Sequence, residues 1–201
     1  QYDDEGNLIA KGEVNYFPVN PKLEALIEIL KEKGPKEKTV VWSVNVPDIK
    51  AISERLEKEG IKFVTYYGET KDADRDAAVK AFNEDPTIKV FLGNQAAGST
   101  GINLWGYNPE WVGTEKDHGC NVTQVIYYAC NWNMVQRAQS EDRCHRRGTR
   151  ETVRYTDLVV PGTIDDQIRA RVLAKQMTAL SIQDVRKIME AILEAVPVDE
   201  E

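Results

Sequence analysis

The sequence predicts an α/β fold in which a mostly parallel sheet is covered by helices on both faces. Three observations carry this prediction. Short apolar runs rich in β-branched residues recur along the chain, segments with helical periodicity separate them, and Gly or Pro stands at many of the junctions. Strands that alternate with helices form right-handed crossovers, which set the strands parallel and lay the helices over them.

The first two helices have the clearest start and stop signals. Asn20-Pro21 provides an N-cap and a proline at the first helical position, apolar residues follow at helical spacing, and Gly34 ends the segment. A second helix begins at Pro47 and ends at Gly60. The remaining elements are predicted as strands at 39–44, 61–67, 88–92, 122–128 and 152–160, and helices at 72–82 and 133–147.

We expect one compact domain with extensions, because 201 residues only modestly exceed the usual ~150 of a domain. The predicted parts are an N-terminal extension at 1–20, which includes a strand or hairpin, a main lobe at 21–162, and a C-terminal helical extension at 163–201. Capping-box patterns at 163–166 and 181–184 begin the two helices of the last part. The chain opens with Gln1 and no Met, so we expect it to be a piece of a longer protein.

The composition argues against several classes of function. No stretch approaches the ~18 to 20 apolar residues of a membrane span, and the first residues lack a secretory signal, so we expect neither a membrane nor an exported protein. A net charge of −7 argues against nucleic-acid binding driven by overall charge. Arginines are nevertheless concentrated between Arg137 and Arg154. Three irregularly spaced cysteines fit a reducing compartment better than a disulfide framework or a zinc site.

Ligands of open α/β sheets bind beyond the carboxyl ends of the strands, so the segments after Leu92 and Tyr128 are candidate sites. The first, at 93–101, has the spacing of a phosphate-binding loop, but Ser99 stands where the lysine would be. A dinucleotide fingerprint does not fit either. We therefore expect no autonomous nucleotide hydrolase. The small residues either let a backbone approach a ligand closely or form a plain tight turn.

The second candidate site is the predicted helix at 133–147, one face of which is polar. Two amides are followed there by two guanidiniums at spacings of three and four residues, which aligns them. Guanidiniums present forked donors that suit phosphate oxygens. A solvated face paired with neighbouring carboxylates is the alternative. The four residues are Gln136, Gln139, Arg143 and Arg146.

Taken together, these segments resemble the Swi/Snf-type branch of superfamily-two helicases and DNA translocases. The resemblance is carried in chain order by 40–43 (motif IV), 67–82, 98–104 (motif V), 132–148 (motif VI) and 163–175. It spans roughly residues 38 to 180, and it implies two RecA-like lobes with ATP held in the cleft between them. This chain resembles the second of these lobes, a single RecA-like three-layer domain.

The resemblance implies a role for eight residues. Arg143 and Arg146 would be arginine fingers for the γ-phosphate of ATP, which in related systems contribute ~10³ to 10⁵ in rate. The residues expected near the nucleotide are Gln139, Gly101 and Asn103, and those expected on the DNA backbone are Ser43, Gln95 and Gly98.

The resemblance also implies partners. ATP and Mg²⁺ would be held mainly by the N-terminal RecA-like lobe of the same polypeptide, because this chain lacks the Walker lysine and the acidic box. Alone, the chain is expected to be inactive, and it is expected to hold no metal itself. Double-stranded or branched DNA is the expected track. The expected location is inside the cell, in the cytoplasm or, in a eukaryote, the nucleus.

Several alternatives stay open. The chain departs from the family pattern at some positions, for example at Ser99 and at Ala129, where the family commonly has an acid. Both arginines are nevertheless present, so the nucleotide role is kept, and the alternative function is a non-catalytic RecA-like module that binds nucleic acid or protein. Trp42 and Trp132 are expected to pack at strand ends more than to stack on bases. The long loop at 106–120 has no assigned role.

Overall fold

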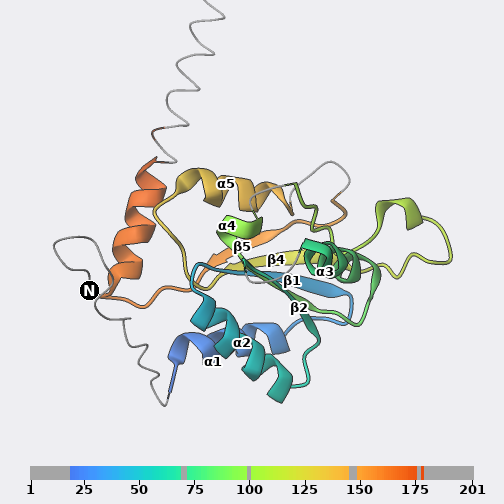
Figure 1. Ribbon diagram of the computed structural model, residues 1–201, viewed down its shortest axis with the longest axis horizontal. Helices are drawn as coiled ribbons and strands as arrows, with labels where there is room; N and C mark the ends of the chain where they lie inside the picture. The colour runs from blue at the N-terminus through green and yellow to red at the C-terminus, as the bar shows by residue number, and fades with distance from the viewer. Residues whose placement is uncertain (1–18, 69–71, 99–100, 145–148, 176–177, 179–201) are drawn as a thin grey trace, which may run out of the picture.

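A computed structural model of the chain describes residues 19–68, 72–98, 101–144, 149–175 and 178 (Figure 1). Within them, five strands form one parallel sheet with helices on both faces, which confirms the predicted α/β class and a single RecA-like domain. The strands are β1 (Glu37–Ser43), β2 (Phe63–Tyr66), β3 (Val90–Asn94), β4 (Asn121–Tyr127) and β5 (Arg154–Asp157). The helices are α1 (Pro21–Lys31), α2 (Val46–Lys58), α3 (Asp72–Glu84), α4 (Gln95–Gly98) and α5 (Met134–Asp142), and residues 164–175 are also helical.

The strand order is β2-β3-β1-β4-β5, so β1 lies in the middle of the sheet. It pairs with β3 on one side, where Val41 faces Leu92, and with β4 on the other, where Val41 faces Ile126. Six of its seven residues are buried, which is expected for a central parallel strand covered on both faces.

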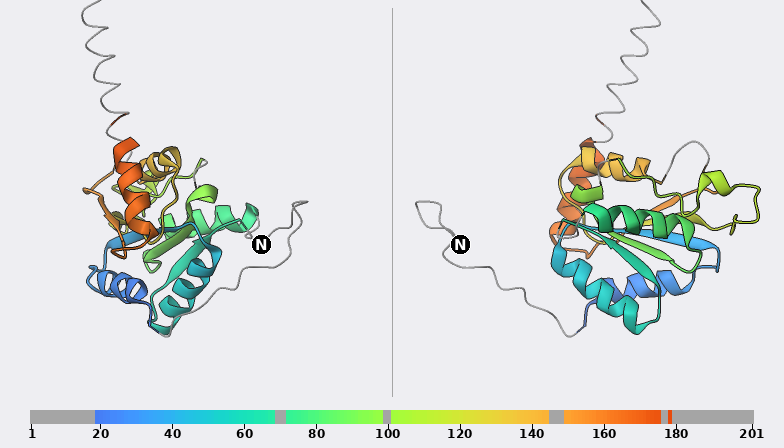
Figure 2. Two further views of the ribbon diagram at one scale, coloured as in Figure 1. Left: turned by 90° about the vertical axis from the view of Figure 1, so that its left-hand side faces the viewer. Right: turned by 45° about the vertical axis from the view of Figure 1, so that its right-hand side comes forward.

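Two apolar cores cover the two faces of the sheet. One core joins Val41 and Leu92 to the apolar faces of α1 and α2, and the other joins Val40 and Trp42 to Phe82 of α3. Neighbouring β1 residues thus enter opposite cores, because successive side chains of a strand point to opposite faces. Figures 1 and 2 show the same division, with α1 and α2 below the sheet and α3, α4 and α5 above it.

The start of α1 is fixed to the C-terminal helix. Asn20 caps α1 as predicted, since its side-chain oxygen accepts a hydrogen bond from the Leu23 amide at 3.2 Å. The same side chain donates to the hydroxyl of Tyr128 at 2.9 Å, and Lys22 pairs with Asp165 of the helix 164–175 at 2.6 Å. The start of α1 and the start of the helix 164–175 therefore meet at the carboxyl edge of the sheet.

The structure differs from the prediction in two elements. A short helix, α4, stands where we expected a plain loop after β3, and α5 ends at Asp142, whereas we expected a helix to residue 147. The N-terminal extension up to residue 18 and the helix expected after 181 lie outside the described residues. The domain boundaries stay predictions. None of the helices in the described ranges is long and apolar enough to cross a bilayer.

The 106–120 loop is attached to the sheet at Gly106. The Gly106 amide donates to Asn83 Oδ1 of α3 at 2.9 Å, and the φ angle of Gly106 is +76°. A Cβ atom at this position would lie 2.9 Å from the Val122 amide nitrogen in β4. That neighbour is backbone, which cannot move aside as a flexible side chain can.

Gly106→Ala is accordingly expected to lower the free energy of unfolding by about 2–5 kcal/mol, from left-handed strain plus the clash. Gly113→Ala is the matched control, because Gly113 has φ +78° and, its chain neighbours aside, nothing lies within 4 Å of the position that a methyl group would take. The Gly113→Ala change should lower the free energy of unfolding by only about 1–2 kcal/mol. Urea unfolding of both variants measures the difference, and equal losses would contradict the role given to the close backbone contact.

Candidate functional site

Ser43 lies at the carboxyl end of β1, one strand away from the start of α4. Its hydroxyl donates to Asp48 Oδ2 at 3.0 Å, near the start of α2, and the residue is fully buried. Asn45 donates to the same carboxylate oxygen at 2.9 Å. The side chain of Ser43 therefore fixes the turn from β1 into α2, and its predicted contact with DNA stays a prediction.

Gln95 is the first residue of α4, directly after β3. Its side chain is only 1% exposed and lines a small cavity of about 40 Å³ whose walls include Tyr127, Arg137 and Val172. Neither atom of its amide group has a hydrogen-bond partner among the described residues. A buried amide without partners is costly and uncommon, so the Gln95 side chain is an unusual feature of this part of the described chain.

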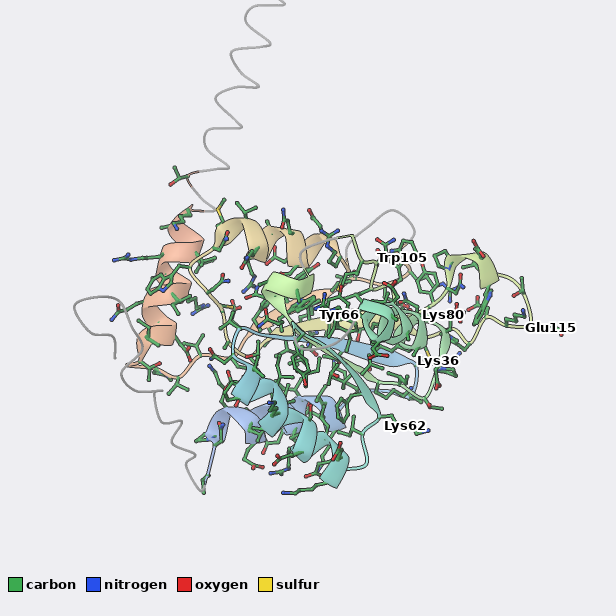
Figure 3. All side chains as sticks on the ribbon, viewed as in Figure 1. Lys36, Lys62, Tyr66, Lys80, Trp105 and Glu115 are labelled. Carbon is green, nitrogen blue, oxygen red and sulfur yellow. The ribbon has the colours of Figure 1, made fainter. Side chains whose placement is uncertain are left out.

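Gly98 ends α4, and the motif V segment continues at Gly101 after two residues that lie outside the described ranges. Gly101 is exposed and has φ +68°. The carbonyl of Asn103 accepts a hydrogen bond from the Asn83 side chain of α3 at 2.9 Å. Gly101 and Asn103 both line a groove of about 380 Å³ beside α3, together with Lys80 and Trp105, which Figure 3 labels.

The α5 helix begins with a side-chain cap and ends at the first predicted arginine finger. Asn133 Oδ1 accepts from the amides of Val135 and Gln136, which fixes the first turn. Gln139 is exposed on the helix, and Arg143 is the C-cap residue and is partly buried. Arg146, the second predicted finger, lies outside the described residues.

A backbone hydrogen bond joins the motif V and motif VI segments. The amide of Leu104 donates to the carbonyl of Arg143 at 3.0 Å. This bond brings Asn103, the residue before Leu104, next to the end of α5. The sequence predicted that both segments serve one nucleotide, and the structure places their backbones in contact.

Four of the predicted site residues fall into two groups. Ser43 and Gln95 lie at the carboxyl edge of the sheet, since Ser43 is paired with Asn94 in the β1–β3 ladder. Asn103 and Arg143 lie at the C-terminal end of α5. At ~1.5 Å per residue, Arg143 is about 13 Å along the helix axis from Met134, the first residue of α5. Figure 1 shows α4 and α5 above the same face of the sheet.

Sequence reasoning assigned no role to Arg137, a residue of α5 whose side chain faces the sheet. Its side chain is 11% exposed, pairs with Glu141 at 2.6 Å, and also pairs with Asp157 of β5. The spacing of Arg137 and Glu141, four residues apart on a helix, was a signal for the first contact. Nothing in the sequence pointed to the second, because it joins residues from different elements.

Arg150 and Trp42 have structural roles. Arg150 donates to both oxygens of Asp117 and lies over the Tyr107 ring at 4.2 Å, which fastens the 106–120 loop. This guanidinium holds the pKa of the Asp117 carboxyl well below its usual range. Trp42 is fully buried, as expected for a packing residue, whereas Trp132 is 38% exposed.

Several known proteins are similar to this chain in sequence. The family described as "Helicase conserved C-terminal domain" matches residues 21–108. Chromatin-remodeling ATPase INO80 of Sclerotinia sclerotiorum is 32% identical over 77% of this chain and 8% of its own length, and that of Aspergillus oryzae is 33% identical over 77% and 10%. Helicase SWR1 of Kluyveromyces lactis is 31% identical over 73% of this chain and 8% of its own.

The fold is also similar to that of a solved structure. The C-terminal part of the Fun30 ATPase domain matches with a TM-score of 0.63 and 27% identity, over 75% of this chain and 45% of that one. The chain spans about a tenth or less of the length of the curated relatives it matches.

Proposed function

The chain is the C-terminal RecA-like lobe of a Snf2-type helicase, and from this we propose that it is the second half of an ATP-dependent DNA motor. In this proposal the lobe supplies Arg143 and Arg146 to an ATP molecule held by the first lobe of the same polypeptide. Closure of the two lobes on ATP and their opening after hydrolysis would move the protein along DNA.

The observation that carries the proposal is the hydrogen bond from Leu104 to the carbonyl of Arg143. It ties the segment that would approach the nucleotide and the DNA to the helix that would stabilise charge on the γ-phosphate. A shift of either segment would therefore move the other. Coupling of ATP hydrolysis to movement along DNA requires such a link.

The residues on this lobe fit a phosphate ligand better than a metal. Arg143 offers a forked cationic donor, Asn103 offers an amide whose Oδ1 is buried without a partner in the described residues, and Gly101 leaves room for close approach. Mg²⁺ prefers carboxylate and water oxygens, and no group of three His, Cys, Asp or Glu residues gathers in the described ranges. The first lobe would hold Mg²⁺ and most of the ATP.

DNA contact is proposed at Ser43, Gln95 and Gly98. The amide of Gln95 has no partner within the described chain, so it would break no hydrogen bond on leaving its cavity to reach a DNA phosphate. The hydroxyl of Ser43 is bonded to Asp48, so contact there would use the backbone. Gly98 would likewise offer its backbone.

The location follows from the kind of work proposed. Relatives of this chain carry the name chromatin-remodeling ATPase. Of the two locations expected from the sequence, the cytoplasm and, in a eukaryote, the nucleus, we propose the nucleus for the whole protein.

The proposal predicts that ATP hydrolysis needs both lobes and DNA. We expect the full-length protein to hydrolyse ATP with a rate that DNA raises at least about tenfold, and the 201-residue chain alone to have no activity over background. A coupled phosphate-release assay with and without duplex DNA measures both. Hydrolysis by this chain alone would contradict the division of labour. A full-length protein that binds DNA but hydrolyses no ATP would instead favour the non-catalytic module.

A further inference from the structure

The helix that carries Arg143 has unusually little apolar contact with the sheet. Among the nine residues of α5, Ser140 alone is buried, and Val135 is 56% exposed. Most helical stability in proteins comes from packing of an apolar face. Polar contacts must therefore set how α5 is placed on the sheet.

Arg137 makes several of these contacts. Its guanidinium carbon lies 3.4 Å from the centre of the Tyr127 ring in β4, and its Nη1 pairs with Asp157 in β5. Its Nε donates to Glu141 of the same helix at 2.6 Å, and Nη1 also contacts Cys130 Sγ at 3.4 Å. One side chain thus connects α5 to two neighbouring strands.

The neighbours of the buried Arg137 guanidinium favour its positively charged form. Burial disfavours a charged guanidinium, but the hydrogen bonds to Asp157 and Glu141 outweigh it, so the pKa of Arg137 is raised above its ordinary value. Burial raises the pKa of the neighbouring Cys130 thiol to about 11, so the thiol adds no negative charge at neutral pH. The guanidinium of Arg137 is therefore positively charged at neutral pH, and the Cys130 thiol beside it is uncharged.

A second contact fixes α5 one turn further along. The hydroxyls of Tyr127 and Ser140 lie 2.8 Å apart, and Ser140 also donates to the carbonyl of Arg137 at 2.7 Å. Tyr155 of β5 donates to the carbonyl of Glu141 at 3.0 Å. The last contact stands two residues before Arg143, so the position of that arginine follows from them.

We propose that Arg137 is a positioning residue for Arg143. It fixes the rotation of α5 about its axis and the distance of α5 from the sheet, so that the arginine finger points to the γ-phosphate. This inference rests on the proposed function, because it assumes that Arg143 acts on ATP. A misplacement of about 1 Å can cost on the order of 100-fold in rate, which makes the anchoring of the helix important for catalysis.

The test uses the full-length protein with Arg137→Met and Arg137→Lys. Methionine keeps much of the aliphatic part of the side chain and removes the guanidinium group. Lysine keeps a positive charge for Asp157, but it neither stacks as well on Tyr127 nor reaches two carboxylates. We expect Arg137→Met to lower the DNA-stimulated kcat about 10- to 100-fold with the KM for ATP changed less than about threefold. Lysine should restore part of the loss. An unchanged kcat in the methionine variant would overturn the proposal.

A double-mutant cycle with Arg143→Ala separates positioning from a general effect. If Arg137 acts through Arg143, the double variant Arg137→Met/Arg143→Ala should be no slower than Arg143→Ala alone. Losses that multiply would overturn the inference about Arg137. An active Arg143→Ala protein would instead overturn the proposed function itself, so the two failures can be told apart.

Arg55 provides a matched control on the opposite face of the sheet. In α2 its Nε donates to Glu59, four residues on, at 2.9 Å, and its Nη atoms pair with Glu24 of α1 at 2.6 and 2.8 Å. Arg55→Met removes a similar ion-pair cluster far from α5, so it should leave kcat within about twofold. An equal loss of kcat in this variant would show that the loss of any ion-pair cluster lowers kcat, and it would overturn the specific role of Arg137.

If Arg137→Met fails to fold, Asp157→Asn removes the same ion pair with a smaller change of structure. This variant is expected to lower kcat as well, and a kcat within about twofold of the wild type would then overturn the proposal.

Discussion

Arg143→Ala in the full-length protein is expected to lower the DNA-stimulated kcat for ATP hydrolysis by about a thousandfold or more. The guanidinium would meet negative charge that develops on the γ-phosphate in the transition state, and arginine fingers are worth about 10³ to 10⁵ in rate. Because α5 is held by Arg137, Ser140 and Glu141, loss of the Arg143 side chain should leave the helix in place. Steady-state kinetics at saturating DNA measures the effect.

Two controls sharpen this experiment. Arg154→Ala removes an exposed arginine at the start of β5 and should keep kcat within about twofold. Arg143→Lys should stay far below the wild type, since an ammonium group lacks the planar fork. Activity of Arg143→Ala within tenfold of the wild type would contradict the assignment.

The second predicted finger is tested in the same way. Arg146→Ala is expected to cause a loss of the same kind, because the resemblance to motif VI gives both arginines a role at the γ-phosphate. Hydrolysis that stays within a factor of about two of the wild type would reject that role. The same kinetic assay, run beside Arg143→Ala, gives the answer.

Trp42→Ala is expected to lower the free energy of unfolding by about 3–5 kcal/mol, the usual range for a large aromatic residue in a core. Trp42 is fully buried and packs edge-on against Phe91, with ring centres 5.8 Å apart. A Cβ on Gly93 would lie 2.5 Å from its Cζ3 atom, which shows how closely the indole ring lies against β3. Losses of this size are a large fraction of the roughly 5–15 kcal/mol that stabilises a typical domain.

Chemical unfolding of three variants tests the packing argument. Trp42→Phe should lose less, about 1–2 kcal/mol, because it keeps part of the ring volume and removes an Nε1 group that has no partner in the described structure. Trp132→Ala, at an exposed position, should change the free energy of unfolding by less than about 1 kcal/mol. A Trp42→Ala protein as stable as the Trp132→Ala protein would contradict the assignment of Trp42 to the core.

The order of the strands and helices could be predicted because each carries a local signal. The run at 39–44 is apolar and β-branched, and Asn20-Pro21 marks a helix start, so β1 and α1 were found close to their observed bounds. The end of α5 was misplaced because nothing in the 143–147 segment is a local stop signal. The α4 helix, only four residues long, has too few positions to show a period.

The site could be predicted only in part. The resemblance pointed to Arg143 and Asn103, whose roles stay predictions, and the structure brings their segments together through the hydrogen bond from Leu104 to Arg143. The burial of Gln95 and the network of Arg137 could not be found in this way. Both depend on residues of β4, β5 and the helix 164–175 that meet only in the folded chain.

The place of β1 in the strand order limits where the chain can be cut. Its partners β3 and β4 lie far along the sequence, so neither edge of β1 is covered early in synthesis. A fragment that ended at residue 108, where the matched helicase family stops, would lack β4 and leave one whole edge of this apolar strand open. Such bare edges pair with other chains, so that fragment would tend to aggregate rather than fold, and an expression boundary must lie beyond β4.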